Sequence, residues 1–471
     1  MASAEDLPRS ELPDMTHGHD SETTESWFDR TMHMDQYGTR LPFGSLGAKG
    51  LTHRFVELSG ADRGRELNVL DASGGYASAC LGAGSPVVGA ALSRAVEEAG
   101  YVTDEIHSWE RSKLLELLFR GDGLWAEQFP ADEYHVAGRN SGSEGMEMAL
   151  RLALESRFDH RRLRPAEGRG HRDIVLAFEG AWHGWTGGLL PLLNKRHYRI
   201  GLPSVAPEPY GFTVRHIPFG QFDAAREFFA RHGDRVLAVV IEPVQGDAGI
   251  IVPPAGYLRE VARLCTDSGA LLVADEVLTF AKTGQFFGMA DENGPIPTDV
   301  SVVGKSLGMG ALSTSMVIAR RNLTVRATGA ISTSDLRPLT CAVIRAGLEH
   351  IQAEGMLEKS RGLGEHVAKR LDEELVTAFP ELYTESRGSG VMHGVELTQR
   401  VADRLGEFRE TMIRSGVFVE FMGGAGRRSG GLRYVFPTMR VAPPIVSTLA
   451  DADAIVERLA AGSRSFLEVS A

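Results

Sequence analysis

The chain has 471 residues, of which 43% are hydrophobic and 24% charged, proportions that are ordinary for a soluble globular protein. Its net charge of −12 and the lack of a basic stripe with interleaved aromatic residues argue against a nucleic-acid partner. No apolar run reaches membrane-spanning length, the acidic N-terminus lacks an apolar signal core, and the three cysteines are too widely spaced to suggest a disulfide frame. We therefore expect a cytoplasmic protein that binds neither membranes nor nucleic acids.

The N-terminal part of the chain carries few structural signals. Residues 1 to about 25 are polar and predict a mobile lead-in, and the residues after them are mixed and weakly patterned. His17 and His19 have no further ligands at zinc spacing, so no metal site is expected. A short strand is predicted at 67–70 and an amphipathic helix at 86–99.

A Ser-Gly-Ser turn precedes the next predicted helix. The apolar residues of 144–158 recur at helical spacing, and Ser143 is a good N-cap for that helix. Together with Ser141 and Gly142, it offers hydroxyls and backbone N–H groups at the positive end of the helix, which suits a phosphate. Plain helix capping would also explain this motif.

Four short apolar runs predict buried strands of a parallel, doubly wound sheet in an α/β fold. These runs are 173–178, 236–241, 271–274 and 300–303. A helix is predicted between the second and third, at 256–268. Ligands of such sheets bind outside the carboxyl ends of the strands, so the residues that follow the runs are expected along one edge. They are Trp182, Glu242, Asp275 and Lys305.

Asp275 and Lys305 are the most informative pair on that edge. A desolvated lysine can form an imine with a carbonyl, and a carboxylate can hold a protonated pyridine nitrogen. Pyridoxal phosphate (PLP) chemistry needs both, and an aromatic residue such as Trp182 can stack on a flat ligand. A surface lysine beside a strand cap is the simpler alternative.

Gly304-Lys305-Ser306 also resembles the end of a phosphate-binding P-loop, but Asp299 stands where that motif needs glycine.

The C-terminal third has a different pattern. A long helix is predicted at 339–353, and 391–397 alternates like a half-buried antiparallel strand, as does 432–436. Arg440 and a terminal helix close this smaller α+β unit. An arginine before two prolines can bind a substrate carboxylate or anchor the fold, and both interpretations remain open.

Seven motifs, in order from about residue 70 onward, resemble those of the class III (omega) aminotransferases. This family of PLP enzymes of fold type I also includes glutamate-1-semialdehyde aminomutase and some amino-acid racemases. The motifs are 140–144, 182–184, 242–246, 275–277, 304–310, Thr333 before Pro338, and Arg440 before Pro443 and Pro444. The resemblance implies a large PLP-binding domain at 76–340 with a mostly parallel sheet flanked by helices. It also implies a smaller α+β domain built from 1–75 and 341–471.

The resemblance also implies a role for each residue that faces the cofactor. Lys305 forms the imine with PLP, and Asp275 pairs with the pyridine nitrogen. Val277 packs on one face of the ring and Trp182 stacks on the other, where the family usually has tyrosine or phenylalanine. Glu242 lies near the cofactor and shapes the substrate pocket.

Further implied roles concern the phosphate, the partner subunit and the substrate. Ser141, Gly142 and Ser143 hold the phosphate, and Thr333 of a neighbouring subunit reaches it, so a homodimer is implied. In the members specific for amino acids, an arginine at the position of Arg440 binds the substrate carboxylate. An acidic residue at the position of Asp247 can pair with that arginine.

The sequence thus predicts an aminotransferase that moves an amino group between a small-molecule donor and a carbonyl acceptor by ping-pong chemistry. An aminomutase or racemase on the same scaffold is the alternative, and it would need no added keto acid. A protein that has lost catalysis and serves as a binding module is a third hypothesis. The departures from the family pattern, such as Leu336 where a glycine is usual, leave the substrate undetermined.

Overall fold

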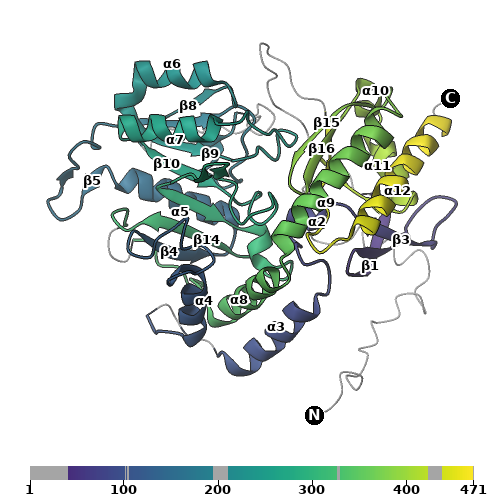
Figure 1. Ribbon diagram of the computed structural model, residues 1–471, viewed down its shortest axis with the longest axis horizontal. Helices are drawn as coiled ribbons and strands as arrows, with labels where there is room; N and C mark the ends of the chain where they lie inside the picture. Colours follow the sequence, from purple (N-terminus) through teal and green to yellow (C-terminus); the bar gives the residue numbers. More distant parts are fainter. Residues whose placement is uncertain are drawn as a thin grey trace.

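A seven-stranded sheet forms the larger of two bodies in the computed structural model, which describes residues 41–100, 102, 105–194, 211–325, 329–422 and 437–469 (Figure 1). In chain order its strands are β4 (Tyr134–Arg139), β7 (Ile174–Phe178), β8 (Thr213–Ile217), β9 (Val236–Ile241), β10 (Leu271–Asp275), β13 (Val300–Val303) and β14 (Ser315–Arg320). The spatial order is β4-β14-β13-β10-β9-β7-β8. β14 runs antiparallel to both of its neighbours, and the other strands share one direction.

The four predicted strands of this sheet are confirmed, and all their residues are buried. Burial on both faces explains why these strands appear as continuous apolar runs. Alternate residues point to opposite faces. Val175 belongs to the same buried cluster as Met146 of α5 (Gly142–Glu155), whereas Leu176 belongs to the cluster of Val261 of α7 (Tyr257–Ser268). With α6 (Phe222–His232) beside α7, helices cover both faces.

The smaller body combines the two ends of the described chain. One sheet has the order β1-β2-β3-β17, in which β3 pairs in parallel with β17. The other is antiparallel, with the order β15-β16-β19-β18. The strands are β1 (Phe43–Lys49), β2 (Thr52–Glu57), β3 (Glu66–Asp71), β15 (Tyr383–Ser389), β16 (Met392–Leu397), β17 (Val417–Phe418), β18 (Glu420–Met422) and β19 (Thr438–Val441). The predicted fold class, with a smaller α+β part made from both chain ends, is confirmed.

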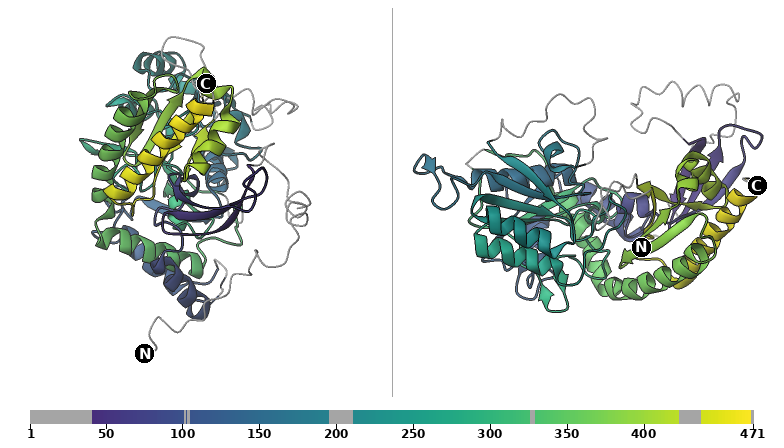
Figure 2. Two further views of the ribbon diagram at one scale, coloured as in Figure 1. Left: turned by 90° about the vertical axis from the view of Figure 1, so that its right-hand side faces the viewer. Right: turned by 90° about the horizontal axis from the view of Figure 1, so that it is seen from above.

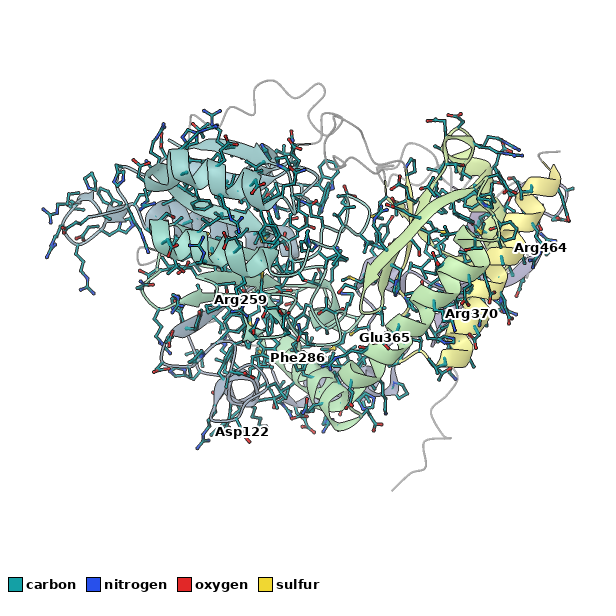
Figure 3. All side chains as sticks on the ribbon, turned by 45° about the horizontal axis from the view of Figure 1, so that its top comes forward. Asp122, Arg259, Phe286, Glu365, Arg370 and Arg464 are labelled. Atoms are coloured by element: carbon teal, nitrogen blue, oxygen red, sulfur yellow. The ribbon has the colours of Figure 1, made fainter. Side chains whose placement is uncertain are left out.

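Helices link and cover the two bodies. Those that lie in or beside the smaller body are α9 (Met356–Leu371), α10 (Gln399–Ala402), α11 (Leu405–Arg414) and α12 (Leu449–Val469). α3 (Pro86–Glu98) and α4 (Trp109–Phe119) pack against α8 (Pro338–Ala353). Figure 2 shows α8 and α9, in green, running from the large sheet to the smaller body. Arg370 of α9, labelled in Figure 3, and His366 one turn before it both contact Asp453 of α12.

The remaining elements are short. They are α2 (Gly74–Ala77), the two-stranded pairs β5 (Phe158–Asp159) with β6 (Arg164–Pro165) and β11 (Ala290–Asp291) with β12 (Gly294–Pro295), the 3-10 turns Leu190–Leu192, Gly233–Arg235 and Lys305–Gly308, and the π turn Asp372–Val376. None of the described helices is both long enough and apolar enough to cross a bilayer.

Some details of the sequence interpretation were wrong. The N-cap of α5 is Ser141, whose side chain accepts a hydrogen bond from the backbone N–H of Glu144, and Ser143 lies inside the helix. β16, predicted as half-buried, is buried at every position, because Val395 and Leu397 lie in the main hydrophobic cluster and Met392 packs in another with Val244 and Ile250. The weakly patterned segment before residue 67 contains β1 and β2. The lead-in with His17 and His19 and the strand predicted at 432–436 lie outside the described residues.

Candidate active site

A cavity of about 950 Å³ lies between the carboxyl edge of the large sheet and the antiparallel sheet of the smaller body. All of the site residues expected from the sequence except Thr333 line it: Ser141, Gly142, Ser143, Trp182, Glu242, Asp247, Asp275, Val277, Lys305 and Arg440. The large sheet delivers most of them, because β4, β7, β9, β10 and β13 all end at this edge. The opposite wall contains Tyr76, Phe421 and Met422 in addition to Arg440.

Asp275, at the end of β10, is held on both carboxylate oxygens. Oδ2 lies 2.8 Å from Nδ1 of the buried His183, and Oδ1 accepts a hydrogen bond of 3.1 Å from the backbone N–H of Val277. Burial alone would lower the pKa of His183, but its hydrogen bond and attraction to Asp275 outweigh burial and raise that pKa. Nε2 of His183 is buried without a hydrogen-bond partner among the described residues. This nitrogen is therefore available to a group bound in the cavity.

Lys305 follows β13 on a 3-10 turn, in the left-handed region with φ of 44°. That conformation costs a non-glycine residue roughly 1–2 kcal/mol, and such strain is typical of functional sites. Burial and the charge of Arg440 together lower the pKa of Lys305 to about 8, against the opposing effect of Asp275 and Glu242. A substantial fraction of neutral amine is therefore present near neutral pH, as a nucleophile or base requires.

The N-terminus of α5 opens onto the same cavity. The Ser141 carbonyl accepts a hydrogen bond of 2.7 Å from Ser315 Oγ, which fixes the turn before the helix. A Cβ atom on Gly142 would lie 2.7 Å from Cγ1 of Val277, so only glycine fits between the turn and that side chain. A Cβ atom on Gly184 would lie even closer to Oγ of Ser143. This packing leaves the first backbone N–H groups of a 14-residue helix facing the cavity, where an anion is stabilised.

Glu242 connects two segments of the cavity wall. Its Oε2 accepts a hydrogen bond of 2.9 Å from the backbone N–H of Trp182, and Oε1 accepts one of 3.2 Å from Gly246. Burial, with the charge of Asp275 adding to it, raises the pKa of Glu242 to about 7. Trp182, positioned in this way, packs edge-on against Trp185 with ring centroids 4.6 Å apart. The two indoles form an aromatic side of the cavity.

The opposite wall centres on Arg440 of β19, which is only 3% exposed. Its Nη2 donates to Oε2 of Glu420, directly across the strand pair on β18. Oε1 of Glu420 accepts a hydrogen bond of 2.8 Å from the backbone N–H of Tyr76. Burial lowers the pKa of Arg440 to about 10, against the charge of Asp247, which also lines the cavity. The described hydrogen-bond partner of Arg440 is thus Glu420, where the resemblance pointed to Asp247.

The turn that carries Tyr76 is left-handed over four consecutive residues. Gly74, Gly75, Tyr76 and Ala77 have φ of 58°, 56°, 55° and 60°. Asp71 holds the start of the turn, since its Oδ1 accepts hydrogen bonds from the backbone N–H of Gly74 and of the residue before it. The sequence pointed to neither Glu420 nor Tyr76. The paired glycines were the available signal, because glycine tolerates positive φ.

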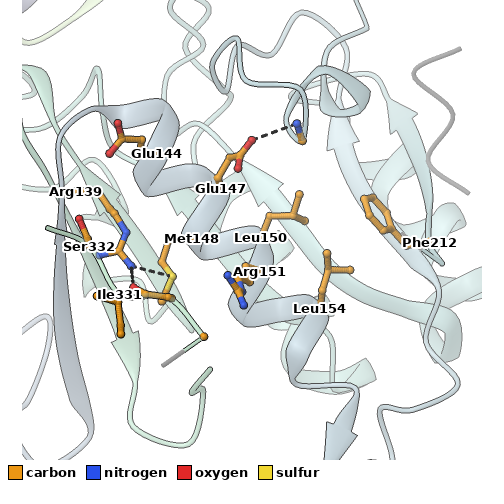
Figure 4. Close-up of a pocket in the computed structure, with 13 residues that line it drawn as sticks. Arg139, Glu144, Glu147, Met148, Leu150, Arg151, Leu154, Phe212, Ile331 and Ser332 are labelled. Atoms are coloured by element: carbon orange, nitrogen blue, oxygen red, sulfur yellow. Dashed lines mark hydrogen bonds between the residues drawn. The ribbon is translucent and has the colours of Figure 1, made fainter. Parts of the chain in front are cut away.

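Thr333 lies apart from this cavity, exposed in a turn before α8. A second cavity of about 650 Å³ lies next to it, between α5 and residues 329–332 (Figure 4). There the Arg139 guanidinium donates to the carbonyl of Ala330 at 3.0 Å, while Ile331 is 70% exposed. Leu336, at the usual glycine position, is buried with φ of 43°. Among the described residues, no group of three His, Cys, Asp or Glu side chains could hold a metal ion.

Comparison with known proteins agrees with this geometry. The family described as Aminotransferase class-III matches residues 62–461. The ornithine aminotransferase of Bordetella pertussis is 32% identical over 330 residues, which are 69% of this chain and 72% of that protein. The mitochondrial ornithine aminotransferase of Oryza sativa is 31% identical over 262 residues, 55% of this chain and 53% of that protein. The crystal structure of ornithine aminotransferase from Toxoplasma gondii ME49 has a TM-score of 0.78 at 22% identity, covering 96% of this chain and 97% of that one, which supports the fold.

Proposed function

The chain belongs to the class-III aminotransferase family and is a PLP-dependent transaminase, and we propose that the cavity between its two bodies is the active site. There an amino group moves from an amine or amino-acid donor to a carbonyl acceptor. The observation that carries this assignment is that Asp275 and Lys305, 30 residues apart in sequence, end neighbouring parallel strands and line one cavity. No other lysine lines the cavity within the described residues.

The residues of the cavity fit PLP. Lys305 offers an amine to the aldehyde, Asp275 a carboxylate to the pyridine nitrogen, and the N-terminus of α5 its N–H groups to the phosphate. The unpartnered Nε2 of His183 provides a further polar contact. When bound, PLP supplies an electron sink for the charge that remains after a proton leaves the substrate Cα.

We assign the reaction steps to this chain's own side chains. Lys305 would hold the cofactor through Nζ until the substrate amine takes its place there, and the freed lysine amine would then accept the proton from the substrate Cα as general base and return it as general acid. Asp275 keeps a proton on the pyridine nitrogen, because a nearby negative charge raises the pKa of a base. His183 keeps Asp275 in place. Val277 and Trp182, which both line the cavity, would hold the ring between them and exclude water.

The substrate binds on the Arg440 side. Arg440 provides a cation for a carboxylate, while Asp247 and Glu242 provide acids that suit a cationic amine. Such a cavity fits an amino acid with a second amine remote from its carboxylate. Ornithine, the substrate named for the relatives, has that pattern, so we propose ornithine-like amino acids as donors.

We further propose a homodimer in which Thr333 reaches the phosphate in the neighbouring subunit. Thr333 is exposed, and the second cavity and the exposed Ile331 lie beside it, where a second copy would cover them. Ile331→Glu should then yield monomers that retain PLP poorly, as measured by sedimentation and cofactor retention. A wild-type monomer in sedimentation would refute this assembly.

The division into domains also remains our proposal. We place the large PLP-binding domain at 76–340, and the smaller domain at 1–75 and 341–471. Parallel pairing of β3 with β17 supports the joining of the two chain ends. Limited proteolysis should cut first near these limits, and preferential cutting within β9 or β10 would contradict them. A cytoplasmic location is likewise a proposal, which microscopy of the tagged protein would test.

The experiment that tests the function is a donor screen on the PLP-loaded protein. Ornithine, N-acetylornithine and a carboxylate-free amine are each supplied with and without a keto acid, and product and cofactor absorbance are followed. Aminotransferase activity predicts one cofactor-limited turnover without keto acid and continuous turnover with it. Continuous product without keto acid would instead identify an aminomutase or racemase, and no conversion by any amine would identify a binding module.

A further inference from the structure

Three strands of the antiparallel sheet place Arg387, Gly394 and Arg440 side by side. Arg387 on β15 pairs with Gly394 on β16, and Gly394 pairs with Arg440 on β19. Directly paired residues of antiparallel strands project from the same face of a sheet. The two arginines therefore flank, on one face, a position that has no side chain. Arg440 lines the cavity, whereas Arg387 does not.

A loop of the larger body, residues 245–251, lies against this row of the sheet. A Cβ atom on Gly394 would stand 2.7 Å from the carbonyl oxygen of Gly249, and one on Gly249 would stand 2.7 Å from Nη2 of Arg387. Gly249 also has φ of 108°, which glycine adopts most readily. Both glycines thus allow the close approach of the two bodies. The loop carries Asp247, which lines the cavity, and we call it the Asp247 loop.

The Arg387 guanidinium joins this loop to the sheet. Its Nε donates a hydrogen bond of 2.7 Å to the carbonyl of Gly249. Its Nη1 donates to Oε2 of Glu396 on β16 at 3.0 Å and also to the exposed Glu385. Its Nη2 donates to Oγ1 of Thr438 on β19 at 3.3 Å. The side chain is thus anchored on the strands of the smaller body and reaches the larger body with its third nitrogen.

The Asp247 loop adopts an unfavourable backbone conformation. Ile250 has φ of 57°, in the left-handed region that β-branched residues rarely adopt. Its side chain is fully buried, in a cluster that includes Met392 of β16. Backbone hydrogen bonds join Gln245 and Ile251 in both directions across the loop. Strain of this kind persists only where surrounding contacts hold it, so losing a contact with the smaller body should favour other loop conformations.

Building on the aminotransferase function proposed above, we propose that Arg387 is a positioning residue that fixes the distance between Asp247 and Arg440. It does so by holding the carbonyl of Gly249 against the sheet. In the proposed function Arg440 binds the carboxylate of a diamino acid, and Asp247 accepts the amine that does not react. The distance between these two side chains then selects donors by the separation of their charged ends.

Two variants and one control separate this role from a general effect on stability. Arg387→Met removes the contact with the loop and keeps the apolar part of the side chain. Arg387→Lys keeps a charge for Glu396, but its single nitrogen cannot make all the contacts of a guanidinium. Arg370→Met is the matched control. Arg370 lies on α9 of the same body, is 18% exposed, and pairs with Glu374 and Asp453, which do not line the cavity.

The first measurement is amide hydrogen exchange of the PLP-loaded protein, read by mass spectrometry on peptides that cover 245–251. In Arg387→Met, exchange of the Asp247 loop should be about tenfold faster, because it loses a hydrogen bond to a charged group. Peptides from β9 should keep the wild-type rate. Arg387→Lys should also exchange faster in the loop, and Arg370→Met should match the wild type. Wild-type exchange of the loop in either folded Arg387 variant would overturn the proposal.

The second measurement compares ornithine with norvaline and 5-aminopentanoate, each of which lacks one of its two amines. The product of ornithine shows which amine reacts, and the analogue that keeps this amine is the reference. In Arg387→Met the KM for ornithine should rise about tenfold with little change in kcat, because the contact of Asp247 with the second amine is no longer positioned. The constant of the reference, KM as a donor or Ki as an inhibitor, should change little. Equal rises for ornithine and the reference would overturn the proposal.

These results are distinguishable from a failure of the proposed function. A wild type that transaminates ornithine while the Arg387 variants keep the loop protected would refute only the positioning role. Faster loop exchange in a protein that transaminates none of these donors would refute the proposed donors, and the hold of Arg387 on the loop would stand.

Discussion

The two walls of the proposed active site each contain a buried carboxylate beside a basic side chain, but they are built differently. Asp275 is fixed by His183 and by the backbone N–H of Val277, two residues further along the same strand end. Glu420 holds Arg440 from a neighbouring strand and Tyr76 from a turn 344 residues away in sequence. The first wall is thus built within the large sheet, where His183, which follows β7, meets Asp275 at the end of β10. The second joins three segments of the chain: β18, β19 and the turn that carries Tyr76.

The largest effect is expected on the first wall, from Lys305→Ala. Loss of the proton-transferring amine should lower the rate of the donor half-reaction by on the order of 10²–10⁴-fold, measured by stopped-flow cofactor absorbance. Lys282→Met is the matched control. Lys282 is also buried, but it donates to the Leu278 carbonyl at 2.8 Å and does not line the cavity. The Lys282→Met variant should be less stable than the wild type but should keep its turnover rate. Equal losses in both variants would contradict the assignment.

Asp275→Asn tests the pair that Asp275 forms with His183. An amide cannot hold a proton on the ring nitrogen by charge, so the half-reaction should slow by roughly 10- to 150-fold, the equivalent of a charged hydrogen bond. The pKa of His183 should fall in NMR titration, since Asp275 is what raises it. Glu276→Gln, the adjacent carboxyl outside the cavity, should retain the rate. A normal half-reaction rate in Asp275→Asn would contradict the role proposed for Asp275 toward the ring nitrogen.

Stability of the second wall is tested by Asp71→Asn. Asp71 accepts hydrogen bonds at the start of the left-handed turn, so the change should cost about 1–3 kcal/mol of unfolding free energy. Burial would raise the pKa of Asp71, but its hydrogen bonds to His53 and Ser73 outweigh burial and lower it. The stabilisation is therefore complete above the ordinary pKa of 3.8 and lost as pH falls through the folded value. Melting curves should differ at pH 5 to 8 and converge in acid.

The smallest expected effect is that of the Arg440 charge on one wall upon the pKa of Lys305 on the other. The rate of PLP capture by cofactor-free protein should rise with pH and level off above about 8, because Lys305 loses its proton there. Arg440→Met should move this midpoint upward, since the arginine lowers the pKa of Lys305. Capture at pH 7 should slow by up to about tenfold, the factor for one pKa unit. Arg440→Lys keeps the charge and should keep the midpoint, and an identical shift in both variants would exclude a charge effect.

The difference between the two walls also explains which features the sequence could predict. Strands β7, β9, β10 and β13 are buried on both faces, so their apolar runs are continuous and the residues that follow them locate the first wall. Lys305 and Asp275 could be identified because each stands directly after such a run. β1 and β2 were missed because they are partly exposed and mix polar with apolar residues.

Other features depend on contacts between distant segments. Ser141 and Ser143 are both acceptable caps in sequence, and only the backbone at the start of α5 selects Ser141. Glu420 belongs to no motif, since its contacts come from the register of β18 against β19 and from the position of Tyr76. Contacts between distant strands leave no local pattern in the sequence. The contacts of the wall that contains Arg440 could therefore be found only in the structure.

The most direct measurement is chemical mapping of the cofactor attachment site. The PLP-loaded protein is reduced with borohydride, digested, and analysed by mass spectrometry for peptides that carry the pyridoxyl group. The account predicts modification at Lys305, and its loss in Lys305→Ala without a shift to Lys282. Modification at another lysine, or none in a protein that catalyses transamination, would contradict it.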